Sequence, residues 1–328
     1  MPFNRLPLGS LSRRLALPAL PAAFAAALML SGCTAGQQDT LFEKAIELGR
    51  DAAHLTLHSA DVGDVEMRYL ERPGTGPTLL LLHGFSANKD TWLKFAAELP
   101  ENYHLIIPDL AGHGDTPAPV NEDYNLIRQA ERLHALLEKN GTQAVHIAGN
   151  SMGGAISAIF ATRYPQQVLS LTLIDAAGVD APNQSDYFKA LAEGKNPLIA
   201  TDEDSFEYRW NFVMSQPPAL PWPLRPAVVR KTLAREGINR EIFSDMMATK
   251  DELTASNFEQ QLSENATMPA LIIWGAEDRV LDVSSVEVFK QKLPQAQVKI
   301  YPGIGHLPMV EIPHETATLM SDFIAGVE

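Results

Sequence analysis

The sequence has little cysteine and little positive charge. One cysteine among 328 residues excludes a disulfide framework and a cysteine-rich zinc site. The 26 lysines and arginines are outnumbered by 40 aspartates and glutamates, and the resulting net charge of −14 argues against nucleic-acid binding, which needs a cationic face. Apolar residues, in contrast, make up 45% of the chain, which is too many for a disordered protein. The composition therefore predicts a globular catalytic or ligand-binding domain.

The first 32 residues have the pattern of an export signal. They carry Arg5, Arg13 and Arg14 and no acidic residue, and sixteen uncharged residues follow from Leu15 to Leu30. A membrane-spanning helix needs about 20 apolar residues, whereas this run is shorter and is interrupted by two prolines. A positive start, a short apolar segment and small residues after it are typical of a secretory signal.

The single cysteine stands at the end of that signal, in Leu30-Ser31-Gly32-Cys33. This tetrapeptide resembles the lipobox of bacterial lipoproteins, and the resemblance implies cleavage before Cys33 and acylation of its thiol. Thr34, rather than an aspartate, follows the cysteine and by the same resemblance implies sorting to the outer membrane. We therefore expect an exported protein held in the bacterial outer membrane by a lipidated Cys33. The alternative is a free thiol after an ordinary cleavage site.

Beyond residue 54, apolar strand-like runs alternate with helical patterns, which predicts a mostly parallel, doubly wound α/β sheet. No strand is evident between Asp175 and Ala270, so we expect a helical cap inserted at about 178–262. The predicted division is a signal at 1–32, a polar tether at 33–54 and one capped domain at 55–328. The predicted strands are Val65–Leu70, Thr78–Leu82, Leu105–Ile107, Ala144–Ala148, Leu169–Ile174, Ala270–Trp274 and Val298–Tyr301.

The sharpest chemical signal is Gly149-Asn150-Ser151-Met152-Gly153, which lies between an apolar strand and a helix start rich in small residues. A serine on such a tight turn is forced into a strained backbone conformation, and the flanking glycines let strand and helix approach closely. The pattern predicts that Ser151 is a catalytic nucleophile. The alternative is an ordinary glycine-rich turn.

A serine hydroxyl needs a base, and the base needs an orienting carboxylate. Of nine histidines, His306 lies in the loop after the last predicted strand, where such a sheet presents its base. Asp278 follows the preceding strand, so the chain order is Ser151, Asp278, His306. Asp175 and Glu277 remain competitors for the acid.

The transition state of acyl transfer needs two N–H donors for its oxyanion. One is expected from Met152, directly after the nucleophile, and the other from Phe85, in the turn His83-Gly84-Phe85. We expect His83 to brace this turn by hydrogen bonding rather than to transfer protons. Asp109 and His113, in another glycine-rich turn, are interpreted as structural.

These motifs resemble the α/β-hydrolase superfamily, and within it the monoacylglycerol-lipase-like branch and related bacterial lipases. The resemblance rests on His83–Trp92, Gly149–Gly154, Ile272–Gly275 with Asp278–Val283, and Gly305-His306, and it covers most of residues 65–328. It implies an α/β-hydrolase fold and a lipase or esterase that cleaves acyl esters through an acyl-enzyme on Ser151, with no metal or cofactor. The cap residues expected to form the apolar wall of the acyl pocket are Phe206, Trp210, Met214 and Trp222.

Three alternatives stay open on sequence alone. A carbon–carbon hydrolase of aromatic ring cleavage can carry the same Gly149–Gly154 motif, although an export signal disfavours it. An acyltransferase uses the same three residues with an alcohol in place of water. A non-catalytic lipoprotein that binds a small apolar ligand is the reading from a different class of protein, and it is disfavoured because all three catalytic residue types are present.

Overall fold

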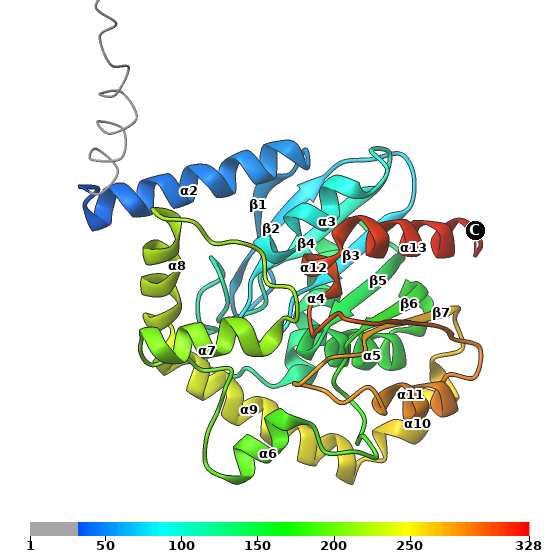
Figure 1. Ribbon diagram of the computed structural model, residues 1–328. Helices are drawn as coiled ribbons and strands as arrows, with labels where there is room; N and C mark the ends of the chain where they lie inside the picture. Colours follow the sequence, from blue (N-terminus) through cyan, green and yellow to red (C-terminus); the bar gives the residue numbers. More distant parts are fainter. Residues whose placement is uncertain (1–31, 328) are drawn as a thin grey trace, which may run out of the picture.

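The computed structural model describes residues 32–327 and places one mixed sheet at the centre of the domain (Figure 1). The described residues form eight strands in the order β1-β2-β4-β3-β5-β6-β7-β8. The first two pairings are antiparallel and all later ones are parallel. The strands are β1 Thr56–Asp61, β2 Glu66–Arg72, β3 Thr78–Leu82, β4 His104–Pro108, β5 Val145–Asn150, β6 Val168–Ile174, β7 Ala270–Gly275 and β8 Gln297–Tyr301.

Helices cover both faces of the sheet, as the apolar strands require (Figure 1). Side chains alternate along each strand, so Leu80 and Leu82 enter one core while Leu79 and Leu81 enter the other. The first core includes α4 (Leu126–Lys139), α5 (Met152–Arg163) and α11 (Ser285–Lys292). The second includes the short helix η1 (Lys89–Trp92), α3 (Leu93–Glu98), α12 (Pro308–Glu311) and α13 (Pro313–Ala325).

The helical cap lies between β6 and β7, as predicted, because no described segment there pairs with the sheet. The cap also has a small core of its own, formed by Ala200, Phe206 and Val229. Its helices are α6 Asp186–Ala192, α7 Glu203–Val213, α8 Leu224–Leu233, α9 Glu236–Ala255 and α10 Phe258–Asn265.

Two elements differ from the sequence prediction. Strand β1 was missed because most of its residues are exposed and it carries no apolar alternation. The polar tether expected at 33–54 is instead largely the helix α2 (Ala35–Ala52), which begins with a capping box between Thr34 and Gln37. None of the helices between residues 32 and 327 is long and apolar enough to span a membrane.

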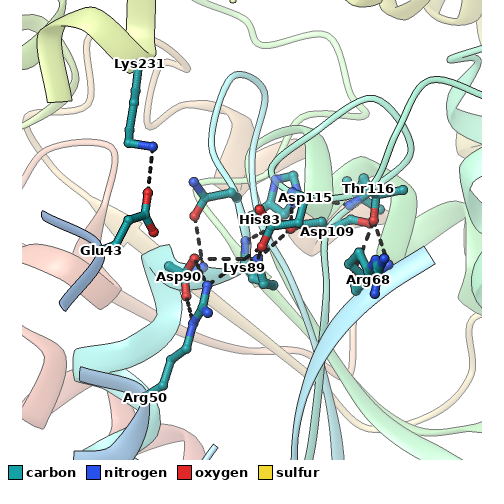
Figure 2. A network of polar contacts seen from close by, with 12 residues as sticks. Glu43, Arg50, Arg68, His83, Lys89, Asp90, Asp109, Asp115, Thr116 and Lys231 are labelled. Carbon is teal, nitrogen blue, oxygen red and sulfur yellow. Dashed lines mark hydrogen bonds and ion pairs between the residues drawn. The ribbon is translucent and has the colours of Figure 1, made fainter. Parts of the chain in front are cut away.

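Helix α2 is tied to both the cap and the sheet domain (Figures 1 and 2). Its Glu43 pairs with Lys231 of α8 at 2.6 Å. In its last turn Arg50 makes two bonds of 2.7 and 2.8 Å with Asp90 of η1. Because helix α2 contacts both the cap and the sheet domain, residues 35–52 are part of the folded domain rather than a tether that leads to it.

Next to Asp90, a network of buried charges joins the segment after β3 to the loop after β4 (Figure 2). Asp109 is fully buried and accepts bonds of 2.7 Å from the Lys89 backbone N–H, the Lys89 ammonium and the Asp115 N–H. Burial alone would lower the pKa of Lys89, but the carboxylates of Asp109 and Asp90 outweigh it and raise the pKa. The structural interpretation of Asp109 is thereby confirmed.

Replacement of Asp109 tests this network. Asp109→Ala leaves the buried Lys89 ammonium without its main counter-charge, and we expect the free energy of unfolding to fall by about 3–5 kcal/mol. Urea denaturation followed by circular dichroism measures it. Glu193→Ala, which removes an exposed partner of Lys195, is the control and should leave the unfolding midpoint unchanged. Equal stability of the two variants would contradict a structural role for Asp109.

Candidate active site

Ser151 occupies the sharp turn between β5 and α5. Its backbone angles are φ +56° and ψ −121°, a strained conformation for a residue with a side chain. The turn is held by its N–H, which donates to the carbonyls of Ile174 and Asp175 at 3.1 Å. A Cβ at Gly149 would lie 2.1 Å from the carbonyl oxygen of Gly153, so only glycine allows strand and helix to approach this closely.

His306 and Asp278, 28 residues apart in the chain, are joined by a hydrogen bond. The Nδ1 atom of His306 lies 2.8 Å from Oδ2 of Asp278. The other oxygen, Oδ1, accepts from the N–H groups of Val280 at 2.7 Å and Leu281 at 3.1 Å. These bonds fix the carboxylate, and both side chains are buried. An imidazole whose Nδ1–H is held by a carboxylate presents Nε2 as a base.

Two residues outside the sequence prediction position the His306 loop. The side-chain amide of Asn150, next to the serine, donates to the carbonyl of His306 at 3.0 Å and so brings the two loops together. Glu311 accepts from the N–H of Gly305 at 3.0 Å. Asn150 lies inside the serine motif, but the sequence does not show that it bonds His306, because the two residues are 156 positions apart and meet only in the folded sheet. No sequence signal singled out Glu311.

The predicted oxyanion donors, Phe85 and Met152, line the same cavity as Ser151. Met152 is the first residue of α5, where helix N–H groups lack an intrahelical partner. The Gly84–Phe85 peptide is oriented by His83, whose Nδ1 lies 2.8 Å from the Gly84 carbonyl and whose Nε2 accepts from the Leu110 N–H at 3.1 Å. Within the described chain neither the Phe85 nor the Met152 N–H has an acceptor.

Complete burial lowers the pKa of His83, so its ring is neutral and can donate from one nitrogen while it accepts at the other. The ring of His113 lies 5.0 Å away, also fully buried and with a pKa lowered by desolvation. Both rings are therefore part of the loop packing, and the bracing role expected of His83 and the structural interpretation of His113 are confirmed.

A cap arginine also contacts the Phe85 loop. Arg209 of α7 donates to the carbonyl of Ser86 at 3.3 Å and to that of Leu198 at 3.1 Å. Burial lowers its pKa to about 10, which still leaves it charged at neutral pH. Ser86 has a positive φ of 59°, so this bond stabilises a strained residue directly after the predicted oxyanion donor. No sequence motif predicted this contact.

The two competing acids are placed differently from Asp278. Glu277 is exposed on the adjacent turn. Asp175 is fully buried at the end of β6, and one atom each of Asp175, Asp278 and His306 lie within 4.8 Å of one another. Burial, and then the neighbouring Asp278, raise the pKa of Asp175 well above its usual value. The hydrogen bond to the imidazole is nevertheless made by Asp278.

A cavity of about 650 Å³ lies between the sheet domain and the cap. Ser151, Phe85 and Met152 line it together with cap side chains, of which the apolar ones include Tyr187, Phe188, Leu198, Met246, Leu253 and Phe258 and the polar ones include Asp180, Lys250, Asn257 and Glu259. A concave pocket that combines apolar walls with polar groups is typical of small-molecule sites.

The four cap residues predicted as its apolar wall do not line this cavity. Phe206 packs inside the cap, where its ring stacks on Trp210 at 6.0 Å between centroids. Met214 is buried at the end of α7, and Trp222 is exposed. The prediction was wrong because helical spacing identifies an apolar face but not whether that face meets a cavity or the core of the cap.

A mixed sheet with a kinked serine after β5 and a histidine–carboxylate pair after β8 and β7 defines an α/β hydrolase. Residues 77–313 match the alpha/beta hydrolase fold family, and the chain belongs to it.

The chain is 35% identical to Lipase 3 of Moraxella sp. (strain TA144), over 97% of this chain and 99% of that protein. It is 31% identical to a monoacylglycerol lipase of Xenopus laevis, over 85% of each. Among solved structures, a membrane phospholipase A described as a bacterial virulence factor is 40% identical, with a TM-score of 0.83 and coverage of 93% of this chain and 96% of that one.

Substitution at Gly149 tests the geometry of the turn. The added Cβ of Gly149→Ala would clash with the Gly153 carbonyl, so we expect loss of reaction with a serine-directed phosphonate probe together with a lower melting temperature. Gly237→Ala in α9, where nothing lies within 4 Å of the new Cβ, is the control and should label normally. Normal labelling of Gly149→Ala would refute the close approach of strand and helix.

Proposed function

We propose that the protein is a serine hydrolase that cleaves carboxylic esters of lipids through an acyl-enzyme. The observation that carries the proposal is the bond between His306 and Asp278 in the loops beside the kinked Ser151, which lines an apolar cavity. Ser151 is the nucleophile, His306 the general base and Asp278 the residue that orients the imidazole.

In this reaction Nε2 of His306 takes the proton of the Ser151 hydroxyl as its oxygen attacks the ester carbonyl. The N–H groups of Phe85 and Met152 donate to the resulting oxyanion. His306 then gives the proton to the leaving alcohol, and the C–O bond of the ester breaks. Water then attacks the acyl-enzyme while His306 takes its proton. The carboxylic acid is released, and His306 returns the proton to the oxygen of Ser151.

The relatives support a lipid ester rather than a ring-cleavage product as substrate. Proteins at 31–40% identity over most of both chains are named lipase, monoacylglycerol lipase and phospholipase A. The apolar lining of the cavity suits an acyl chain, which gains free energy for each CH₂ removed from water. We therefore propose a glycerolipid ester as substrate, with one acyl chain in the cavity.

Alanine substitution of the nucleophile and the base tests the proposal. Ser151→Ala and His306→Ala should each lower hydrolysis of p-nitrophenyl esters by roughly 10⁴-fold or more, because the members of such a triad act as one unit. His314→Ala removes an exposed histidine paired with Glu98 and is the control with unchanged turnover. Near-normal turnover of either site variant would remove that residue from its role.

A substrate panel separates the candidate reactions. Monoacylglycerol, triacylglycerol, phospholipid, short esters and an aromatic ring-cleavage product are each incubated with the protein, and free acid is measured. We expect acid from the glycerolipids. Acid from the ring-cleavage product alone would overturn the ester proposal, and acyl transfer to an added alcohol in preference to water would indicate an acyltransferase.

We further propose that the protein is a lipoprotein anchored through Cys33, in the outer membrane. The predicted signal falls on residues 1–32, of which 1–31 lie outside the described residues. Cys33 is partly exposed, and only Thr34 separates it from α2. Acyl chains on this thiol would therefore hold the folded domain close to the lipid surface through a helix that packs on both cap and sheet domain.

Loss of the thiol tests the anchor. Without acyl chains nothing else in the proposal retains the protein, so Cys33→Ala is expected in the soluble fraction after cell lysis, whereas the wild type stays with the outer membrane. Immunoblotting of the fractions measures this, and ester hydrolysis in the soluble fraction confirms that the variant is folded. Retention of Cys33→Ala in the membrane would contradict a lipid anchor.

A further inference from the structure

Asp175 is a buried carboxyl group that the reaction described above does not use. It follows β6 directly, its side chain is fully buried, and its own φ is +42°. Its carbonyl accepts the N–H of Ser151 at 3.1 Å, so the residue contacts the backbone of the nucleophile. One of its side-chain oxygens lies within 4.8 Å of an oxygen of the Asp278 carboxylate. Asp175 therefore bonds the backbone of Ser151 through its carbonyl and lies close to the Asp278 carboxylate through its side chain.

The carboxyl groups of Asp278 and Asp175 accept different numbers of hydrogen bonds. Asp278 accepts three N–H bonds, from Val280, Leu281 and the His306 ring. Asp175 accepts one, at Oδ1, from the N–H of Gly275 at 2.9 Å. Its Oδ2 is buried and meets no N–H or O–H donor of residues 32–327. Charge is stabilised where donors converge, so Asp278 keeps the negative charge.

Two adjacent buried carboxyl groups do not both ionise, and one of them keeps a proton. The groups that face Asp175 are the carboxylate of Asp278, the imidazole of His306 and, as a further negative charge, Glu311 of α12. Desolvation is the largest cause that raises the pKa of Asp175, and the charge of Asp278 is the second. Asp175 therefore holds its proton at pH values where an ordinary aspartate is ionised.

We propose that Asp175 is a protonated positioning residue whose carboxyl O–H donates to the carboxylate of Asp278. Through this bond Oδ2 of Asp175, as the donor, gains the hydrogen-bond partner that it otherwise lacks, and Asp278 gains a fourth donor. It holds the carboxylate in the orientation that meets the Nδ1–H of His306, and it leaves one negative charge beside the imidazole. Asp175 acts through Asp278 and touches neither substrate nor the reacting atoms. The inference rests on the proposed hydrolase function and deepens it.

The experiment compares two replacements of Asp175 in the full-length protein. In Asp175→Asn the amide N–H donates to Asp278 and the amide oxygen accepts from Gly275, so the variant reproduces the protonated side chain. We expect its kcat to stay within about threefold of the wild type, with the acidic limb of kcat/KM against pH unshifted. In Asp175→Ala the donor is lost, and kcat should fall by about tenfold to hundredfold while KM changes little.

Infrared difference spectroscopy gives a second readout that does not depend on turnover. The wild type minus Asp175→Asn spectrum should contain, at neutral pH, the carbonyl stretch of a protonated carboxylic acid. Asp186→Asn, an exposed aspartate paired with Lys189, is the matched control and should give only carboxylate bands. This measurement decides the proposal even where Asp175→Ala does not fold.

Several outcomes would overturn the proposal. Carboxylate bands from Asp175 would mean that it is ionised, and so would a shift of the acidic limb to lower pH in Asp175→Asn, because removing a negative charge makes the nearby imidazole easier to deprotonate. Unchanged kcat in a folded Asp175→Ala would show a purely structural role. The proposed function fails separately, if the wild type itself neither hydrolyses esters nor reacts with a phosphonate.

Discussion

The whole site depends on the close approach of β5 and α5 at Ser151. The serine holds a positive φ because its N–H is bound by the carbonyls that end β6 and because glycines on both sides leave room for the turn. Strand order does the rest, since β7 and β8 lie successively beyond β6 and their following loops carry Asp278 and His306. Parallel strands present all these loops at one edge of the sheet.

The cap takes part in this arrangement through its contacts with the catalytic loops. Arg209 binds the Ser86 carbonyl beside the expected oxyanion donor, and the N–H of His306 donates to the carbonyl of Val213 at the end of α7. Glu311 accepts N–H groups from both the cap and the His306 loop. The cap that encloses the cavity therefore also positions the loops that carry the groups expected to act in it.

Much of this architecture could be predicted from the sequence, and the rest depended on contacts between distant residues. Seven of the strands were predicted: β3 to β7 are buried and mostly apolar, and β2 and the exposed β8 still place apolar residues among polar ones, whereas β1 gave no such signal. The chain order of Ser151, Asp278 and His306 identified the pair that the structure joins. The choice between Asp278 and Asp175 needed the loop geometry, because each follows a strand. The helix at 35–52 was predicted as a tether because its sequence is polar, and only its contacts with the cap and the sheet domain show that it belongs to the fold. The cavity wall was predicted wrongly because the sequence does not show whether an apolar cap residue faces the cavity or the core of the cap.

The central claim is that the Ser151 hydroxyl, the His306 imidazole and the N–H groups of Phe85 and Met152 converge on one reacting carbonyl. A crystal structure of the protein treated with a lipid-like phosphonate tests it most directly, because the tetrahedral phosphorus resembles the intermediate of ester cleavage. We predict phosphorus bonded to the Ser151 oxygen, the phosphonyl oxygen accepting from both amides, and Nε2 of His306 within hydrogen-bond distance of the serine oxygen. Phosphorus on another residue, or a phosphonyl oxygen bound by neither amide, would contradict the account.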